Sequence, residues 1–288
     1  MKSFEEFLIT NKPIKFIFIG DIMLHPRTLE YESTRNFNFK DCFKEVIPLF
    51  KKADYVIGNL ETTFAGNLEI PKKRSGVFNA PDNFLNILKD IGITHLGNFN
   101  NHTFDFGIDG FQRTYKLIND SKITYLPNTF NDDNANILTY TTHINNLEDK
   151  RITIPENALL STMNQDYLAC QDKINVAFVH WGGQYLNTPN AEQLDHEKML
   201  LNNNYQLIIG NGNHSPLPTI VKDNKLIAYC LGDFFSSHDK PNSTDLGKIL
   251  EVDMIGNKII SVKEYLTKTI TDIKGFSQIH ITESNNLH

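Results

Sequence analysis

Five short apolar runs, each followed by a side chain that can bind a metal ion, constrain this sequence more than any other feature. The first run, Ile14–Ile19, is rich in β-branched and aromatic residues, which favour β-strands. Because the ends of such strands fall along one edge of an open α/β sheet, we expect the side chains that follow the runs to lie together. In chain order these residues are Asp21, Glu61, Asn101 with His102, His180 and His214.

The ligand types in this set indicate which metal the site would take. Carboxylate, amide and imidazole groups together suit Mn²⁺, Fe²⁺ or Zn²⁺ better than Ca²⁺. A carboxylate shared by two such ions is a common arrangement for hydrolysing phosphate esters. The pattern therefore predicts a site for one or two divalent ions.

The stretch Gly97–Gly107 carries the densest set of reactive side chains, between an expected strand at 91–96 and an expected helix at 109–119. Asn101 offers a neutral oxygen, and His102 can bind a metal or transfer a proton. Asp105, three residues later, can hold the His102 ring in one tautomer. The same residue types also build Asx-turns and helix caps, so this stretch alone leaves both interpretations open.

The rest of the chain alternates between strand and helix patterns and shows no internal repeat or linker. We therefore expect a single α/β domain over 1–288, with a core at about 14–266 and a C-terminal tail at 267–288. Glycine and asparagine at 256–257 predict a hairpin turn. The expected helices are 41–52, 81–90, 156–170 and 192–203, and the further strands are 55–60, 137–142, 174–179, 207–209, 226–231, 249–255 and 258–266.

Composition and charge exclude some classes of function. The chain has 288 residues, 40% hydrophobic and 22% charged, as in an ordinary globular protein. Its net charge of -6 argues against sequence-independent binding of nucleic acid. Three scattered cysteines without C-x-x-C spacing suggest reduced thiols. No secretion signal or transmembrane segment is evident, so we expect a cytoplasmic protein.

Six segments in order resemble the CapA-type proteins of bacterial capsule and poly-γ-glutamate synthesis, which look like members of the calcineurin-like metallophosphoesterase superfamily. The segments, which span most of the chain, are GDIML, GNLETTFAG, FNNHTFDFG, VHWGGQY, GNGNHSPLP and AYCLGDFF. The resemblance implies a four-layer αββα sandwich of two mixed β-sheets packed face to face with helices outside.

The resemblance also implies roles for the residues at the strand ends. Asp21 and His214 would hold one metal, Asn101 and His180 the other, and Glu61 would bridge the two. By the same resemblance His102 would protonate the leaving group, oriented by Asp105, which suits phosphate-ester cleavage.

The chain departs from the family pattern at positions that bear on the metals. Gly212 replaces the first histidine of G-x-H-x-H, and Met23 replaces a histidine of the wider superfamily. Asp233 replaces the asparagine of S-L-G-N-F, and Gln184 replaces the glutamate of H-W-G-x-E. Each metal is then short of a ligand, and His25, Asp233, water or substrate would fill the gaps.

Two residues outside the metal set are candidates for binding an anionic small-molecule or polymer substrate. Arg74 belongs to the basic run 72–74, which is either solvated surface or an anion contact near the metals. Trp181 follows His180 and is either a substrate platform or a buried core residue.

We therefore expect a metal-dependent hydrolase, of phosphoesterase type, acting in capsule, exopolysaccharide or polyglutamate synthesis with other proteins of that pathway. Two alternatives stay open. The chain is either a non-catalytic accessory protein with a degraded metal site, or a metal-dependent hydrolase of amide bonds.

Overall fold

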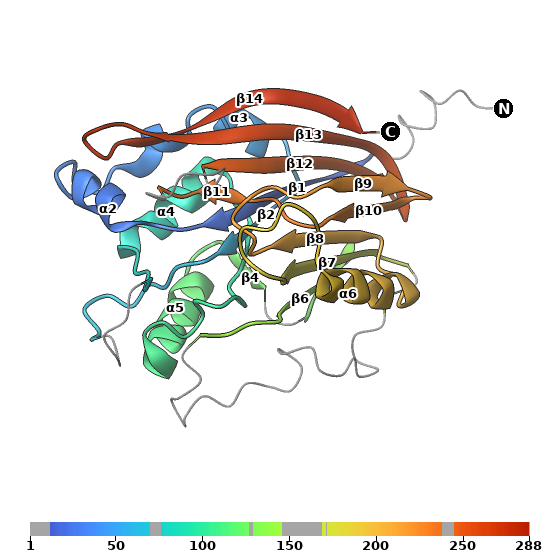
Figure 1. Ribbon diagram of the computed structural model, residues 1–288, viewed down its shortest axis with the longest axis horizontal. Helices are drawn as coiled ribbons and strands as arrows, with labels where there is room; N and C mark the ends of the chain where they lie inside the picture. The colour runs from blue at the N-terminus through green and yellow to red at the C-terminus, as the bar shows by residue number, and fades with distance from the viewer. Residues whose placement is uncertain are drawn as a thin grey trace.

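The computed structural model describes residues 12–69, 76–126, 129–145, 169–170, 172–237 and 245–287, and these form two mixed β-sheets with helices outside (Figure 1). The first sheet has eight strands in the order β14-β13-β12-β1-β2-β3-β4, with β11 also paired to β1. Strands β1 to β4 are parallel neighbours, whereas β12, β13 and β14 form an antiparallel extension. The bounds are β1 Ile14–Ile22, β2 Tyr55–Leu60, β3 His95–Gly97, β4 Thr124–Leu126, β11 Asp233–Phe235, β12 Leu246–Ile255, β13 Lys258–Thr271 and β14 Ser277–Leu287.

The second sheet has six strands in the order β5-β6-β7-β8-β10-β9. Its four central strands are parallel, and the two edge strands run antiparallel to their neighbours. The bounds are β5 Thr129–Asn131, β6 Ala135–Thr141, β7 Ile174–His180, β8 Leu207–Asn211, β9 Thr219–Lys222 and β10 Lys225–Ala228.

Strand alternation assigns the core residues to distinct layers. Phe16 and Phe18 of β1 point between the sheets, where they meet Val176 and Phe178 of β7. Ile17 and Ile19 point to the opposite face. There they pack with α2 (Pro26–Ser33), α4 (Asp82–Ile91), α5 (Gly107–Asp120) and the short helices η1 (Phe39–Phe43) and α3 (Ile47–Phe50) on the same side of the sheet.

The outer face of the six-stranded sheet is covered by α6 (Ala191–Asn202), through Leu200. This helix begins with a capping box in which Asn190 and Gln193 exchange side-chain and backbone hydrogen bonds. Helices, sheet, sheet and helix thus form the four-layer αββα sandwich expected from the sequence.

Two expected elements differ in extent. In place of one helix over 41–52, the chain forms η1 and α3, because Pro48 has no amide hydrogen and cannot sit inside a longer helix. The strand expected at 91–96 is only β3, since α4 runs to Ile91 and Gly92 follows it with φ 109°. The helix expected at 156–170 lies largely outside the described residues.

The expected C-terminal tail at 267–288 is instead sheet structure. Residues up to Thr271 continue β13, and β14 pairs with it from Ser277 to Leu287. Ile279 of β14 is fully buried in the outer core of the eight-stranded sheet.

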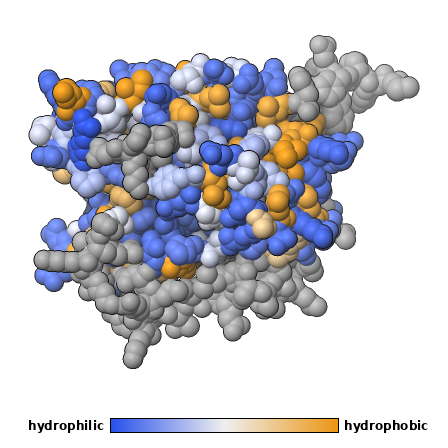
Figure 2. Space-filling model, in the orientation of Figure 1, coloured by the Kyte–Doolittle hydropathy of each residue, from blue (hydrophilic) through white to orange (hydrophobic). Residues whose placement is uncertain are grey.

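Polar side chains dominate the face of the molecule drawn in Figure 2, and hydrophobic ones gather mainly over β9. None of the helices in the described ranges is both long and apolar enough to cross a bilayer.

Candidate metal centre

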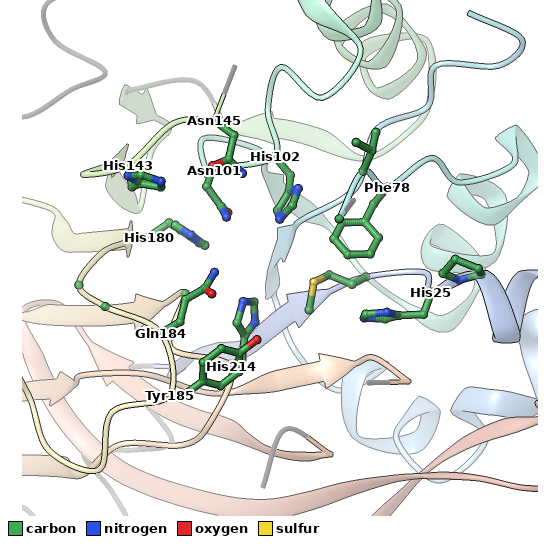
Figure 3. A pocket seen from close by; sticks show the side chains of 17 residues that line it. His25, Phe78, Asn101, His102, His143, Asn145, His180, Gln184, Tyr185 and His214 are labelled. Atoms are coloured by element: carbon green, nitrogen blue, oxygen red, sulfur yellow. The ribbon is translucent and has the colours of Figure 1, made fainter. Parts of the chain in front are cut away.

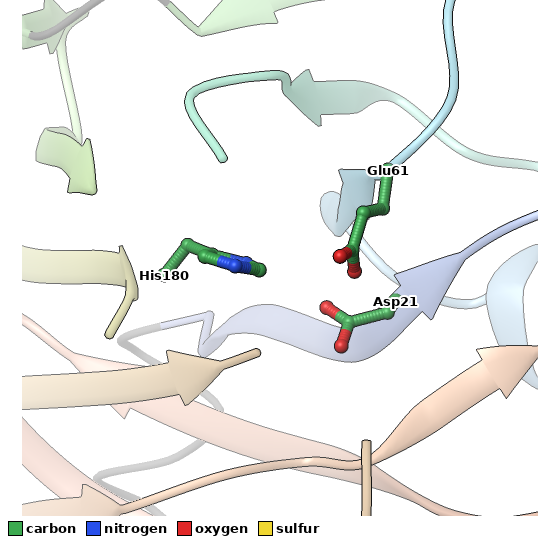
Figure 4. A group of neighbouring side chains, drawn as sticks. All are labelled: Asp21, Glu61 and His180. Atoms are coloured by element: carbon green, nitrogen blue, oxygen red, sulfur yellow. The ribbon is translucent and has the colours of Figure 1, made fainter. Parts of the chain in front are cut away.

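The structure brings the expected strand ends together where the two sheets meet. Asp21 lies near the end of β1, Glu61 follows β2, and His180 is the last residue of β7. One ligand atom from each of these buried residues lies within 4.8 Å of the others (Figure 4). Carboxylates from one sheet therefore face an imidazole from the other.

A second group shares Asp21 and adds His214 and Asp233, again with ligand atoms within 4.8 Å of one another. Parallel pairing of β1 with β11 places Asp233 beside Asp21. His214 Nδ1 lies 3.0 Å from Asp233 Oδ1 and 3.6 Å from Asp21 Oδ2. Asp233 thus belongs to the site, as one of the residues expected to compensate for missing ligands.

Burial dominates the electrostatics of these groups. It raises the pKa of Asp21, and it raises the pKa of Asp233 to about 6. For Glu61, burial and then the negative charges of Asp21 and Asp233 raise the pKa well above its usual range. Burial lowers the pKa of His180 well below its usual range. Clustered carboxylates that resist ionisation are the groups a cation would stabilise.

Glu61 provides the clearest test of whether a metal fits. Both of its carboxylate oxygens are buried, and neither has a hydrogen-bond partner among the described residues. The buried Oδ1 of Asn101 also lacks a partner within this part of the chain. Because unpaired buried oxygens are costly, oxygen and imidazole ligands in this arrangement fit a divalent cation.

His102 and Asp105 form the pair expected from their spacing. His102 Nδ1 lies 2.8 Å from Asp105 Oδ2, and the same oxygen accepts a hydrogen bond from the Phe78 backbone amide at 2.9 Å. The other ring nitrogen, Nε2, lies 3.7 Å from Glu61 Oε1. Asp105 therefore orients the imidazole so that Nε2 faces the carboxylates.

Two asparagines that the sequence analysis did not select tie the site together. Asn59 Nδ2 donates to Asp21 Oδ1 at 2.6 Å and lies 3.2 Å from His180 Nδ1. Asn100 donates to Asn59 Oδ1 at 3.0 Å and accepts from the His102 amide at 3.0 Å. Asn59 and Asn100 lie close to expected ligands in the sequence, and this position could have identified them as part of the site.

A cavity of about 890 Å³ opens above the carboxylates. Asn101, His102, His180 and His214 are directed toward it in Figure 3. Ligand-binding cavities typically measure roughly 300–1,000 Å³, so this one has room for more than an inorganic anion.

Gly212 also lines the cavity, and its amide donates to Asp21 Oδ2 at 3.2 Å. A Cβ at this position would lie 2.9 Å from His180 Nε2, and the residue has φ +101°. The glycine is thus required locally by the close approach of the His180 ring.

Of the two expected substrate contacts, the structure contradicts Trp181 and does not test Arg74. Trp181 is only 1% exposed, packs in the core beneath α6, and donates from Nε1 to the Tyr229 carbonyl at 2.8 Å. The prediction of a Trp181 platform was therefore wrong, because the side chain after His180 on the strand points to the opposite face. Arg74 lies outside the described residues.

Comparison with known proteins identifies the family. The sequence model of the family described as "Bacterial capsule synthesis protein PGA_cap" matches residues 15–154 and 131–238. The chain belongs to this family of bacterial capsule synthesis proteins, as the resemblance predicted.

Two curated relatives are similar at the sequence level. The PGA biosynthesis protein CapA of Bacillus subtilis is 24% identical over 237 residues, which cover 75% of this chain and 62% of that protein. The capsule biosynthesis protein CapA of Bacillus anthracis is 24% identical over 249 residues, covering 78% and 60%. The chain thus spans about 60% of the length of these relatives.

Solved structures are similar at lower identity. A novel phosphatase from Mycoplasma pneumoniae has a TM-score of 0.46 and 13% identity, covering 96% of this chain and 94% of the phosphatase. Vps29 of Chaetomium thermophilum has a TM-score of 0.39 and 11% identity, covering 95% and 98%.

Proposed function

We propose that this protein is a metal-dependent hydrolase that cleaves a phosphate ester in the synthesis of an anionic capsule polymer. The observation that carries the proposal is Glu61, a fully buried carboxylate that faces Asp21 and His180 and has no hydrogen-bond partner among the described residues. A bound divalent cation would polarise the phosphoryl group and lower the pKa of water.

The two groups of ligands divide between two cations. Asp21, Glu61 and His180 would hold one, with Asn101 Oδ1 as a further oxygen ligand. The second cation would take Asp21, His214 and Asp233, and Mn²⁺, Fe²⁺ or Zn²⁺ suits both sets. We assign the shared position to Asp21, which belongs to both groups, and not to Glu61, which belongs to one. Asp233 supplies a carboxylate to the second set, which argues against the degraded-site alternative.

His102 is the proposed general acid. Its Nδ1 is held by Asp105, so the proton on Nε2 can pass to the oxygen of the departing group as the ester bond breaks. Asp105 stabilises the ring in this orientation, and it also accepts a hydrogen bond from the Phe78 backbone amide. An anionic small molecule or polymer segment fits such a site, and membership of the capsule family supports partners from capsule synthesis.

Metal analysis of protein purified without chelators tests the ligand assignment. We expect up to two equivalents of a transition metal in the wild type. Asp21→Asn should lower the content at both positions, whereas Glu61→Gln should lower only one. Retention of full metal content by Asp21→Asn would exclude the shared role.

Turnover of a phosphate monoester tests the catalytic role of His102. His102→Asn should keep its fold and metal content but lose roughly 10²–10⁴-fold in turnover, the usual contribution of general acid catalysis. His280→Asn, at a histidine paired with Glu45 on the surface, is the matched control and should keep wild-type turnover. Equal turnover in both variants would remove His102 from the mechanism.

A further inference from the structure

Tyr185 is a large, exposed aromatic side chain at the cavity that the proposed chemistry does not use. It lines the cavity and is 41% exposed, and its ring centroid lies 5.6 Å from that of His214 at 37°. Figure 3 shows the two rings together on one side of the cavity. An exposed aromatic ring packed at a tilt against a candidate metal ligand is placed to touch a molecule bound at the metals.

The backbone of Tyr185 and of His214 is strained. Tyr185 has φ 61° and His214 has φ 60°, values in the left-handed region that bulky residues avoid. Such conformations cluster at functional sites, where surrounding contacts impose them. Strained backbone at two neighbouring residues of this wall is therefore consistent with a role in ligand contact.

Asn213 fixes the loop that carries Tyr185. Its carbonyl accepts from the Tyr185 amide at 2.9 Å, and its side chain exchanges two hydrogen bonds with the Leu186 backbone at 2.6 and 3.0 Å. Asn213 itself is fully buried. The loop after β7 is thereby held on the loop after β8, and Tyr185 keeps its place above His214.

The opposite wall is also aromatic. Phe78 lies edge-on between His25, at 5.0 Å, and His102, at 4.8 Å between ring centroids. All three residues line the same cavity as Tyr185 (Figure 3). If the anionic end of a substrate lies at the metals, the group attached to it would extend into the cavity beside His102. It would then lie between the aromatic wall of Tyr185 and that of Phe78.

We propose that Tyr185 stacks on the leaving group of the substrate, and that this leaving group is a ring with an apolar face. The inference rests on the proposed function, because it needs the anionic end of the substrate at the metals. Tyr185 is then a residue that determines specificity, and it replaces the platform that Trp181 cannot provide.

Binding of two non-hydrolysable probes to the metal-loaded protein tests the proposal. Methylphosphonate carries the anion alone, and phenylphosphonate adds a ring. We expect phenylphosphonate to bind the wild type more tightly by roughly 2- to 12-fold, the range for aromatic pairs. Tyr185→Ala should abolish this preference and leave methylphosphonate affinity unchanged, whereas Tyr185→Phe should keep the preference. Tyr115→Ala, at a tyrosine of α5 that is 47% exposed, is the matched control.

The outcomes separate the two proposals. Metal-dependent binding of methylphosphonate without a ring preference, or a preference that survives Tyr185→Ala, would overturn the role of Tyr185 and leave the metal site intact. Absence of metal-dependent binding of either probe would overturn the metal-anion site, and the inference with it.

Discussion

Gly212 and Asp233 are two single-residue departures from the family pattern that act on the same site. At Gly212 the chain lacks an imidazole, and the His180 ring occupies the space that a Cβ would need. At Asp233 the chain has a carboxylate in place of an amide, and that carboxylate lies against His214. The site therefore loses a neutral ligand and gains a charged one.

Replacing Gly212 by alanine should weaken metal binding through His180. The new Cβ would meet Nε2 at 2.9 Å, so the ring must shift away from its position facing Asp21 and Glu61. Isothermal titration with Mn²⁺ or Zn²⁺ should show at least a 10-fold loss, since even indirect changes at ligands cost roughly 10–100-fold.

Gly256→Ala separates this contact from backbone strain. Gly256 also has positive φ, at +51°, but no atom lies within 4 Å of the Cβ that alanine would add. Both variants should lose about 1 kcal/mol of stability. Unchanged metal affinity in Gly212→Ala would mean that the His180 ring is not a ligand.

Asp233→Asn should reveal the cost of the extra carboxylate in the metal-free protein. Burial raises the pKa of Asp233 to about 6, so its contribution to stability is present below the unfolded pKa of about 4 and lost as pH rises through about 6. The amide variant escapes this loss. Urea unfolding in chelator should find it more stable than wild type at pH 7.5, by roughly 2–3 kcal/mol at most, and by about a third of that difference at pH 4.5.

Adding metal should reverse the order of stability of wild type and Asp233→Asn. The same variant, measured with and without metal, therefore serves as its own control. With saturating Mn²⁺ the wild type should regain stability at pH 7.5, and Asp233→Asn should regain less. A stability difference that does not change with pH would show that the Asp233 carboxylate is ionised in the folded protein as readily as in the unfolded chain.

At the scale of elements, strand ends were predictable from sequence because their signal is local. The β-branched runs of β1, β2, β7 and β8 favour strands through their local composition, and their polar end residues follow directly. The pairing of β1 with β11 depends on residues that are far apart in sequence, so the place of Asp233 beside Asp21 could only be guessed. Of the two roles that the sequence left open for Trp181, the structure shows the buried core residue, as expected from the alternation of side chains after His180.

The strand β14 was missed because its pattern is weak. It is an edge strand whose residues 282–286 are exposed, so alternation is visible only around Ile279. Polar residues at an edge are nevertheless compatible with a strand, because one side faces water.

Removal of β14 should destabilise the protein, although residues 267–288 were expected from the sequence to form a C-terminal tail. Deleting residues 277–288 would expose the edge of β13 and remove Ile279, and it would break the buried hydrogen bond between the hydroxyls of Ser277 and Thr28. Loss of one buried isoleucine side chain alone costs roughly 2–5 kcal/mol. Deleting only 284–288 should cost far less, and thermal unfolding of the two truncations compares them directly. Equal melting temperatures would mean that β14 contributes nothing to the fold.

At the scale of the whole molecule, the candidate ligands are divided by sheet. Asp21 and Asp233 lie in strands of the eight-stranded sheet and Glu61 directly follows its strand β2, whereas His180 ends β7 and His214 lies in the loop after β8 of the six-stranded sheet. A cation bound by either group of ligands would therefore join the two sheets.

Metal removal should loosen both sheets at this edge together. Saturation at 100 times the dissociation constant stabilises the fold by about 2.7 kcal/mol. Hydrogen exchange should show chelator-induced loss of protection in β1 and β2 and equally in β7 and β8. β13 and β14, remote from the site within their sheet, provide the internal reference. Loss confined to one sheet would contradict a cation held between them.

Because the candidate ligands are divided between the sheets, the site is complete only when the two sheets are packed together. Each group of candidate ligands combines carboxylates at the eight-stranded sheet with an imidazole at the six-stranded sheet. Before the two sheets dock, neither group of ligands is complete. Under the proposed function, full metal affinity and hydrolysis would therefore appear only after the two sheets have docked.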